Sequence, residues 1–190
     1  MTDSHAPGKR ERLTTGAADL LHHQGVLATT LAHVASAADV PLGNVYYYFK
    51  TKDDLIRAVL DTRAEQITAM LATLEQQHRT PRTRLKALVR SWSDMREEVA
   101  RHGCPFGTLG SELGKRDDEL SDAAAGLLEL LIDWAEARFR ELGRGDPREL
   151  AITLIGTVQG AALLANTMRD PEIMASQVRR LEKWIDAVRS

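Results

Sequence analysis

The sequence predicts an all-α protein, with an N-terminal three-helix head followed by a larger helical body and about nine helices in total. Apolar residues recur at helical spacing almost throughout the 190 residues. No segment shows the alternation of a convincing strand, and no Asn-Gly hairpin signal occurs. Charge and helix length both change near residue 50, so we expect two domains, residues 1–50 and residues 51–190.

The first domain is expected to hold one long helix and two short ones. The long helix covers roughly residues 9–24 and ends at Gly25. The short helices lie near residues 31–38 and 42–49, on either side of Asp39-Val40-Pro41. A helix of two turns is not stable alone, so the long helix must supply the apolar face against which the short ones pack.

The body is expected to consist of amphipathic helices with recognisable first residues. A side-chain oxygen at the N-cap accepts a backbone N–H, and proline fits the first turn. Such starts occur at Thr51, Thr80-Pro81, Asp146-Pro147 and Asp170-Pro171, and a further helix is expected from about residue 118 to 142. One helix is expected from Pro81 through Val99, and the glycines and proline of residues 103–110 allow only a short helix after it.

Composition limits the classes of function. The chain is 43% hydrophobic and 27% charged, as in soluble proteins with a core, and no apolar run reaches the roughly 20 residues that span a bilayer. Residues 1–8 lack the apolar region of a secretory signal. A single cysteine excludes an intramolecular disulfide and fits the cytoplasm. The net charge is −2, so a DNA-binding role must rest on a motif.

Residues 29–52 predict a helix-turn-helix whose second helix carries groups suited to DNA. Gly43 allows the backbone to approach a phosphate or a groove wall, and Asn44 offers a donor and an acceptor to base edges. Tyr46 and Tyr47 belong to a run of three tyrosines whose hydroxyls can donate to phosphate. Core packing is the alternative; we favour it for Phe49 and Tyr46, and DNA contact for Asn44 and Tyr47.

Three further residues are expected to support this surface. Thr30 is predicted to cap the first short helix. Lys52 and the helix N-terminus at Thr51 are predicted to form a phosphate-binding corner. The alternative for Lys52 is a solvated surface charge.

At these residues the sequence resembles the TetR family of regulators. The matching positions, within residues 9–60, are Thr29, Thr30, Val34-Ala35, Gly43, Val45, Tyr46-Tyr47, Phe49, Thr51-Lys52 and Leu55. Asp39 stands where the family has glycine, and Pro41 and Leu42 stand where serine and a polar or basic residue are common. Asp tolerates a left-handed turn, and Leu42 can contact a thymine methyl, so the departures affect the operator sequence more than the fold.

The resemblance implies a repressor released from a near-palindromic operator by a small molecule, and not an enzyme. The implied DNA contacts are Thr29, Thr30, Leu42, Gly43, Asn44, Tyr46, Tyr47 and Lys52. The family forms dimers through its last two helices, here residues 148–169 and 171–189, which would place the recognition helices about 34 Å apart. The alternative is that both helices only close the core of the monomer. A helical enzyme or ligand-storage protein is the alternative of another class, but we find no set of acid, base and nucleophile for it.

The family also implies an effector pocket in the body, for which an apolar or aromatic small molecule is expected. The candidate contacts are Trp92, Met95, Phe106, Trp134 and Gln159, although for each of them we favour ordinary core packing. Cys104 lies in a Gly-Cys-x-x-Gly pattern that resembles a TetR subgroup at the junction of helices 5 and 6. Arg101 and His102 nearby would favour the thiolate and allow it to react with oxidants or electrophiles, but we favour the alternative of a small buried residue.

No metal or cofactor is expected. The six histidines show no zinc-site spacing, and the adjacent His22 and His23 should point to different faces of their helix.

Overall fold

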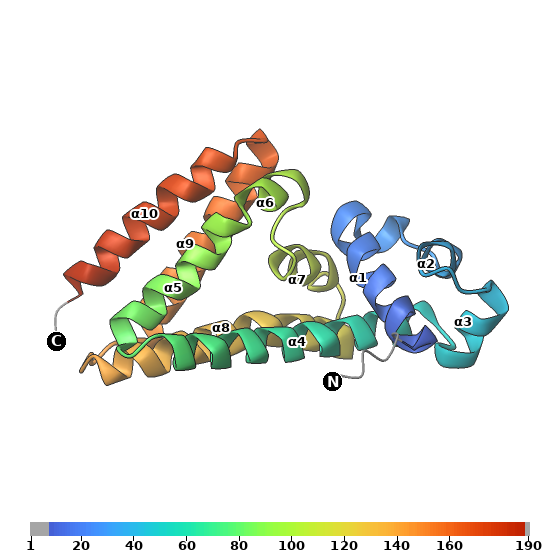
Figure 1. Ribbon diagram of the computed structural model, residues 1–190, viewed down its shortest axis with the longest axis horizontal. Coiled ribbons are helices and arrows are strands. Elements are labelled where there is room, and N and C mark those ends of the chain that lie inside the picture. The colour runs from blue at the N-terminus through green and yellow to red at the C-terminus, as the bar shows by residue number, and fades with distance from the viewer. Residues whose placement is uncertain (1–7, 189–190) are drawn as a thin grey trace, which may run out of the picture.

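The computed structural model describes residues 8–188, which are helical without any strand in that range (Figure 1). The ten helices are α1 (Lys9–Ala28), α2 (Leu31–Ala37), α3 (Leu42–Tyr48), α4 (Lys52–Gln77), α5 (Pro81–Asp94), α6 (Arg96–His102), α7 (Gly107–Leu113), α8 (Glu119–Glu141), α9 (Pro147–Met168) and α10 (Pro171–Ala187). This confirms the predicted fold class. The segment 1–7, expected to carry no signal, and residue 189 of the expected dimer helix lie outside the described residues.

Three of the four predicted helix caps are present, and Asp118 adds one that was not predicted. Thr51 and Thr80 each form a capping box, and Asp118 and Asp170 each accept backbone N–H groups of the first turn. Asp146 is the exception, because its carboxylate accepts two hydrogen bonds from the Arg144 guanidinium, at 2.9 and 3.1 Å, and none from α9. The prediction of a side-chain cap at Asp146 is therefore wrong, although α9 does begin there.

The tenth helix arises because the expected helix from Pro81 through Val99 is interrupted. Met95 has φ −95° and ψ 11°, which separates α5 from α6. Gly103, with φ +83°, then ends α6, and α7 is a short helix of seven residues, as expected for the glycine-rich stretch. The break gives α6 a direction different from that of α5, which brings α6 over α9 (Figure 1).

Two long helices, α4 and α8, pack side by side along the molecule (Figure 1). Helices α5, α9 and α10 complete the body at one end, while α1, α2 and α3 form the head at the other. Helix α7 lies between α1 and α8. The head is therefore connected to the body by α4 and is also in contact with α7.

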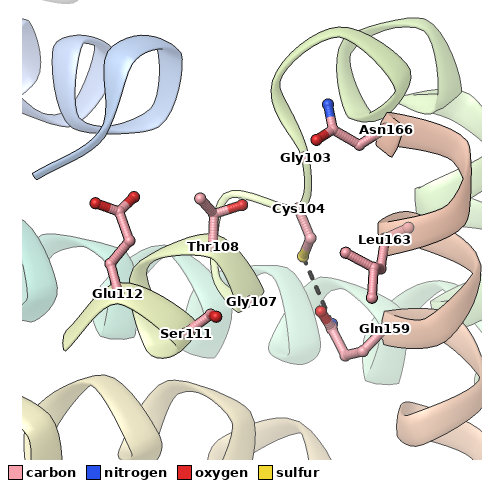
Figure 2. Close-up of a pocket in the computed structure, with 10 residues that line it drawn as sticks. Gly103, Cys104, Gly107, Thr108, Ser111, Glu112, Gln159, Leu163 and Asn166 are labelled. Carbon is pink, nitrogen blue, oxygen red and sulfur yellow. Dashed lines mark hydrogen bonds between the residues drawn. The ribbon is translucent and has the colours of Figure 1, made fainter. Parts of the chain in front are cut away.

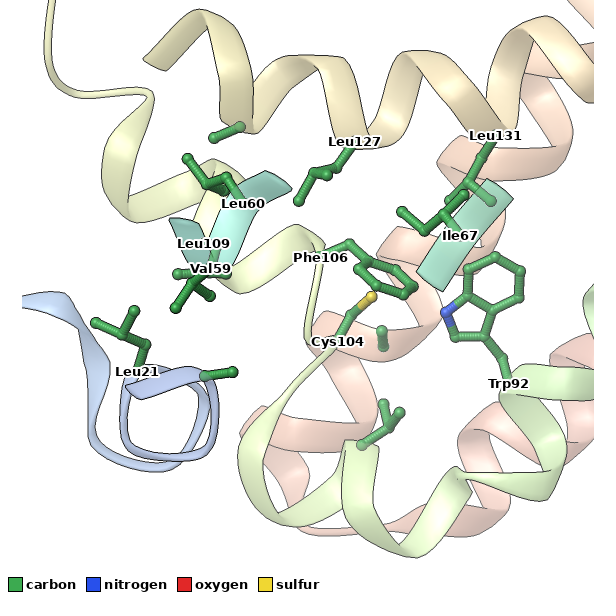
Figure 3. Close-up of a cluster of buried hydrophobic side chains, with 14 of the residues drawn as sticks. Leu21, Val59, Leu60, Ile67, Trp92, Cys104, Phe106, Leu109, Leu127 and Leu131 are labelled. Atoms are coloured by element: carbon green, nitrogen blue, oxygen red, sulfur yellow. The ribbon is translucent and has the colours of Figure 1, made fainter. Parts of the chain in front are cut away.

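The buried apolar side chains form one cluster that runs through both parts. In Figure 3, Leu21 of α1 lies near Val59 of α4 and Leu109 of α7, and the cluster continues into the body through Phe106 and Leu127. Because head and body share this core, a shift of α7 or α4 must move side chains that pack on α1.

Helices α9 and α10 differ in how they use their apolar residues. The apolar face of α10 is buried within this chain, so α10 helps to close the monomer core. Its residues are Met174, Val178, Leu181 and Ile185. Helix α9 also buries one face, but Ile152, Leu163, Leu164 and Met168 are exposed. By length and composition alone α9 could cross a membrane, but 39% of its most apolar stretch is buried against the rest of the chain, and one such helix is weak evidence for a membrane span.

Candidate nucleic-acid interface and adjoining pocket

Helices α2 and α3 pack against each other as a helix-turn-helix. Asp39 adopts the left-handed conformation at φ +50°, as expected for the residue that replaces glycine in this turn. The next residue, Val40, donates its N–H to the Ala35 carbonyl at 2.9 Å and buries its side chain. Val45 of α3 is fully buried, so the opposite face of α3 points toward solvent.

The outward face of α3 carries large side chains that the head leaves exposed. Leu42 is 42%, Tyr46 49% and Tyr47 76% exposed, and Gly43 lies on the same face. Phe49 is buried beneath the Arg10 guanidinium, 5.3 Å from its ring centroid, as predicted. The preference for core packing of Tyr46 is wrong, because its side chain is half exposed. Exposed aromatic and apolar groups on one helix face are typical of an interaction surface.

The paired threonines have different positions. The Thr30 hydroxyl accepts the His33 N–H at 3.1 Å, which is the predicted cap of α2, and Thr30 is exposed. Thr29 is only 2% exposed, and its hydroxyl donates to the Gly25 carbonyl at 2.8 Å. The structure thus places Thr29 inside the head, where it supports the α1–α2 connection instead of lying on the expected contact surface.

The expected phosphate-binding corner at the start of α4 is already occupied by groups of the protein. The Lys52 ammonium donates to the Val26 carbonyl, and Thr51 and Asp54 bond reciprocally in the capping box. The neighbouring Asp53 accepts two hydrogen bonds from Arg116, which hold the pKa of that carboxyl below its ordinary value. These side chains are engaged within the protein, so a phosphate contact at this corner stays a prediction.

Two basic residues near the exposed face of α3 were not singled out from the sequence. The Lys50 ammonium donates to the Tyr46 carbonyl at 2.9 Å, so its charge lies at the C-terminal end of α3. Arg10 of α1 lies over Phe49. Lys50 follows closely after the three tyrosines in the sequence, and this position could have identified it as a candidate DNA contact. Asn44 is half-buried, with its N–H bonded to the Pro41 carbonyl.

A pocket of about 330 Å³ lies between α7 and α9 (Figure 2). Its walls are Gly103, Cys104, Gly107, Thr108, Ser111, Glu112, Gln159, Ala162, Leu163 and Asn166. Of the five predicted ligand contacts, Gln159 lines this pocket. Trp92 and Phe106 are instead buried core residues, Met95 lies at the α5–α6 break, and Trp134 packs beneath Arg138.

Cys104 forms part of the pocket wall and is itself buried, 4% exposed. Its sulfur accepts a hydrogen bond of 3.5 Å from the Gln159 amide (Figure 2). Steric contacts favour glycine at both flanking positions. Gly103 has φ +83°, and Thr108 lies close to the position that a Cβ there would occupy. A Cβ at Gly107 would lie too close to the Gln159 side chain. The Gly-Cys-x-x-Gly segment therefore shapes this wall.

Glu112 connects the pocket to the head. Its side chain lines the pocket from α7 and points toward α1 (Figure 2). There Glu112 Oε2 accepts the Val26 N–H at 2.7 Å, at the break in α1 where Gly25 has φ +83°. A Cβ at Gly25 would lie 3.0 Å from the same carboxylate, so glycine allows this close approach. Sequence reasoning missed this contact because the two residues are 86 positions apart.

Two family models match the chain. "Bacterial regulatory proteins, tetR family" matches residues 13–59, and "Tetracyclin repressor-like, C-terminal domain" matches residues 81–181. Among curated proteins, an uncharacterized HTH-type transcriptional regulator of Mycobacterium tuberculosis is 30% identical over 172 residues, which cover 86% of this chain and 87% of the relative. The transcriptional regulator AcuR of Cereibacter sphaeroides is 29% identical over 171 residues, 84% of this chain and 77% of the relative.

Solved structures agree with these matches. The regulatory protein TetR from Rhodobacter sphaeroides superposes with a TM-score of 0.80 at 26% identity, over 92% of this chain and 97% of that one. A TetR transcriptional regulator from Legionella pneumophila has the same fold, with a TM-score of 0.84 at 20% identity, over 96% and 97% of the two chains. The chain therefore belongs to the TetR family, whose members are DNA-binding transcriptional regulators.

Proposed function

We propose that this protein is a cytoplasmic, dimeric repressor that leaves its operator when a small molecule fills the pocket between α7 and α9. One observation carries the proposal: Glu112 lines the pocket and also accepts a hydrogen bond from Val26 of the head. A ligand that displaces α7 or competes for this carboxylate would weaken the contact that holds α1 in place. Such a ligand can shift the equilibrium between two positions of the head only by the difference between its affinities for them.

The proposed DNA contacts are the exposed residues of α3 and its surroundings. Leu42, Gly43, Tyr46 and Tyr47 form the outward face, with Asn44 beside it and Thr30 at the start of α2. In a helix-turn-helix this second helix enters the major groove, where its side chains meet base edges and phosphates. Lys50 adds positive charge near the tyrosines and joins Lys52 in the proposed set.

The proposed dimer forms through the exposed stripe of α9. Gly156 and Gly160 lie on this stripe with open space where a Cβ would stand, between Ile152 and the pair Leu163-Leu164. Small residues flanked by large apolar ones permit two helices to approach closely. The apolar face of α10 is buried within the monomer. Helix α10 would therefore contribute half-buried and polar side chains to the dimer interface.

The pocket surface is mostly apolar with several hydrogen-bonding groups, so we keep the expectation of a largely apolar small molecule and add polar groups to it. Hydroxyl, amide and carboxylate groups of Thr108, Ser111, Gln159, Asn166 and Glu112 face a space at the lower end of the usual size for ligand sites. Leu163 lies both in this wall and on the exposed stripe of α9. The pocket would consequently open beside the proposed dimer interface.

A thermal-shift screen of small, largely apolar molecules that carry hydrogen-bonding groups, followed by gel shifts, tests this proposal. A molecule that binds only the folded protein raises its Tm by mass action. We expect hits that stabilise the wild type, lose this effect in Gln159→Leu, and release a duplex taken from upstream of the protein's own gene. Hits that need Gln159 yet leave DNA affinity unchanged would contradict ligand release.

Oxidation or alkylation of Cys104 is the second candidate trigger, favoured by its place in the pocket wall. If it operates, Cys104→Ser retains DNA affinity and no longer responds to oxidants. The burial of the thiol favours the small-molecule trigger, for which Cys104→Ser remains responsive to the effector.

A further inference from the structure

A cluster of metal-ligating side chains lies where the head meets the body. His22 and His23 belong to α1 and Glu98 belongs to α6. One ligand atom from each of the three residues lies within 4.8 Å of the others, and His23 Nε2 is 3.2 Å from Glu98 Oε1. Two imidazole nitrogens and a carboxylate oxygen are ligands that Zn²⁺ and related ions take in proteins.

His22 is held in the form that a metal ligand requires. Its Nε2 lies 2.9 Å from the Gly103 carbonyl oxygen, which can only accept, so the proton is on Nε2. In the neutral ring Nδ1 then keeps a free lone pair. Histidines that bind metals commonly donate their second nitrogen to a carbonyl in this way.

The cluster is open to solvent on one side, so an ion can reach it. The side chains of His23 and Glu98 are each 47% exposed. A surface groove of about 470 Å³ is lined by His22, His23 and His102 among other residues. The His102 ring centroid is 4.2 Å from that of His23. Water can therefore reach the fourth position of a tetrahedral ion.

We propose that His22, His23 and Glu98 bind a divalent transition-metal ion such as Zn²⁺, and that the bound ion clamps the DNA-binding head to the body. Without an ion, the exposed His23–Glu98 pair is a weak tie between α1 and α6. Coordination bonds from both helices to one ion hold the contact far more firmly. If the clamp changes DNA affinity, DNA must change metal affinity by the same factor.

The two histidines differ in burial, since His22 is buried and His23 is exposed, as expected for different faces of their helix. Their ring centroids are nevertheless only 5.5 Å apart. The third ligand lies 75 positions further along the chain, on a different helix, where no local spacing rule would find it.

Calorimetric titration of untagged, chelator-stripped protein with Zn²⁺ tests the site. We expect one ion per chain, a raised Tm, and affinity at least about tenfold weaker in His23→Ala and in Glu98→Gln. These two side chains are exposed, so their loss should leave the fold intact, whereas His22→Ala changes a buried residue. His78→Ala, at the far end of α4, is the matched control and should bind like the wild type.

The site is overturned if Zn²⁺ fails to bind or if His23→Ala and Glu98→Gln bind it as the wild type does. An equal loss in His78→Ala would also overturn it, since it would indicate scattered surface binding. For the clamp, we expect Zn²⁺ to slow amide hydrogen exchange in residues 22–28, and unchanged exchange there would refute it. Neither measurement uses DNA, so both are independent of the proposed repressor function.

Discussion

Glu112 Oε2, from the wall of the pocket, accepts the backbone N–H of Val26 in the DNA-binding head at 2.7 Å. The contact occurs at the one place where α1 leaves helical geometry, so the N–H has no helical partner of its own. Lys52 binds the carbonyl of the same residue. Both polar groups of the Val26 backbone are thus held from outside α1, one from α7 and one from α4.

Glu112→Ala is expected to loosen this end of α1. The variant leaves a part-buried N–H unpaired, which costs about 1–3 kcal/mol of unfolding free energy. Amide exchange at Val26 should accelerate more than exchange in α8, because the loss is local. Glu112→Gln keeps an acceptor oxygen and is expected to lie between wild type and Glu112→Ala. Unaltered exchange at Val26 in Glu112→Ala would show that the contact does not hold the head.

Tyr47→Ala is expected to weaken DNA binding without destabilising the protein. The side chain is 76% exposed, so its removal should change the unfolding free energy by no more than about 0.5 kcal/mol. Lost phosphate or base contacts should cost about 1–3 kcal/mol of binding, roughly tenfold or more in Kd. Anisotropy and thermal melting measure the two effects. The half-buried Tyr48 is the comparison, because Tyr48→Ala should lower Tm. If Tyr47→Ala binds DNA with wild-type affinity, Tyr47 is not part of the DNA interface.

Leu163→Glu is expected to convert the dimer into monomers. It places a charge on the exposed apolar stripe of α9, where a second copy would bury it without a partner. Sedimentation velocity measures the change directly. Leu27→Glu is a matched control, since Leu27 is 94% exposed and belongs to the head, outside the exposed stripe of α9. If Leu163→Glu sediments as the wild type does, the dimer forms elsewhere.

Arg116→Gln is expected to lower Tm near neutral pH and to have little effect in acid. Arg116 bridges Asp53 at the start of α4 and Asp118 at the start of α8, and its hydrogen bonds lower the pKa of both carboxyls. Carboxyls with depressed pKa stabilise the fold above their ordinary pKa and lose this contribution as pH falls through the folded-state pKa. The Tm difference from wild type should therefore stay constant from about pH 7 to about pH 5 and shrink as the pH falls below about 4. A difference that persists in acid would indicate that Arg116 acts through packing alone.

Local signals in the sequence predicted the helices well. Thr51 with Asp54, Thr80 with Pro81, and the left-handed Asp39 each depend on residues a few positions apart, and the structure has all of them. The predicted side-chain cap at Asp146 is absent because Arg144, two residues earlier, binds its carboxylate. Local patterns therefore determine where helices begin unless a side chain outside the pattern takes the capping group.

The site residues were harder to predict because their roles depend on distant partners. Lys52 was expected on DNA, but its ammonium meets Val26 across the fold, and Thr29 is buried by the α1–α2 connection. The large aromatic Trp92 was expected in the pocket, yet it fills the core, and smaller polar residues line the space. Glu112 and Glu98 carry no local signal at all, because their partners lie in α1.

The most direct test of the central claim is the anisotropy of a labelled duplex, taken from upstream of the protein's own gene, titrated with protein over a series of salt concentrations. We expect two chains per site and an affinity that falls steeply with salt, because neutralised phosphates release counterions. A protein that stays monomeric and binds no duplex at low ionic strength would contradict the proposed function.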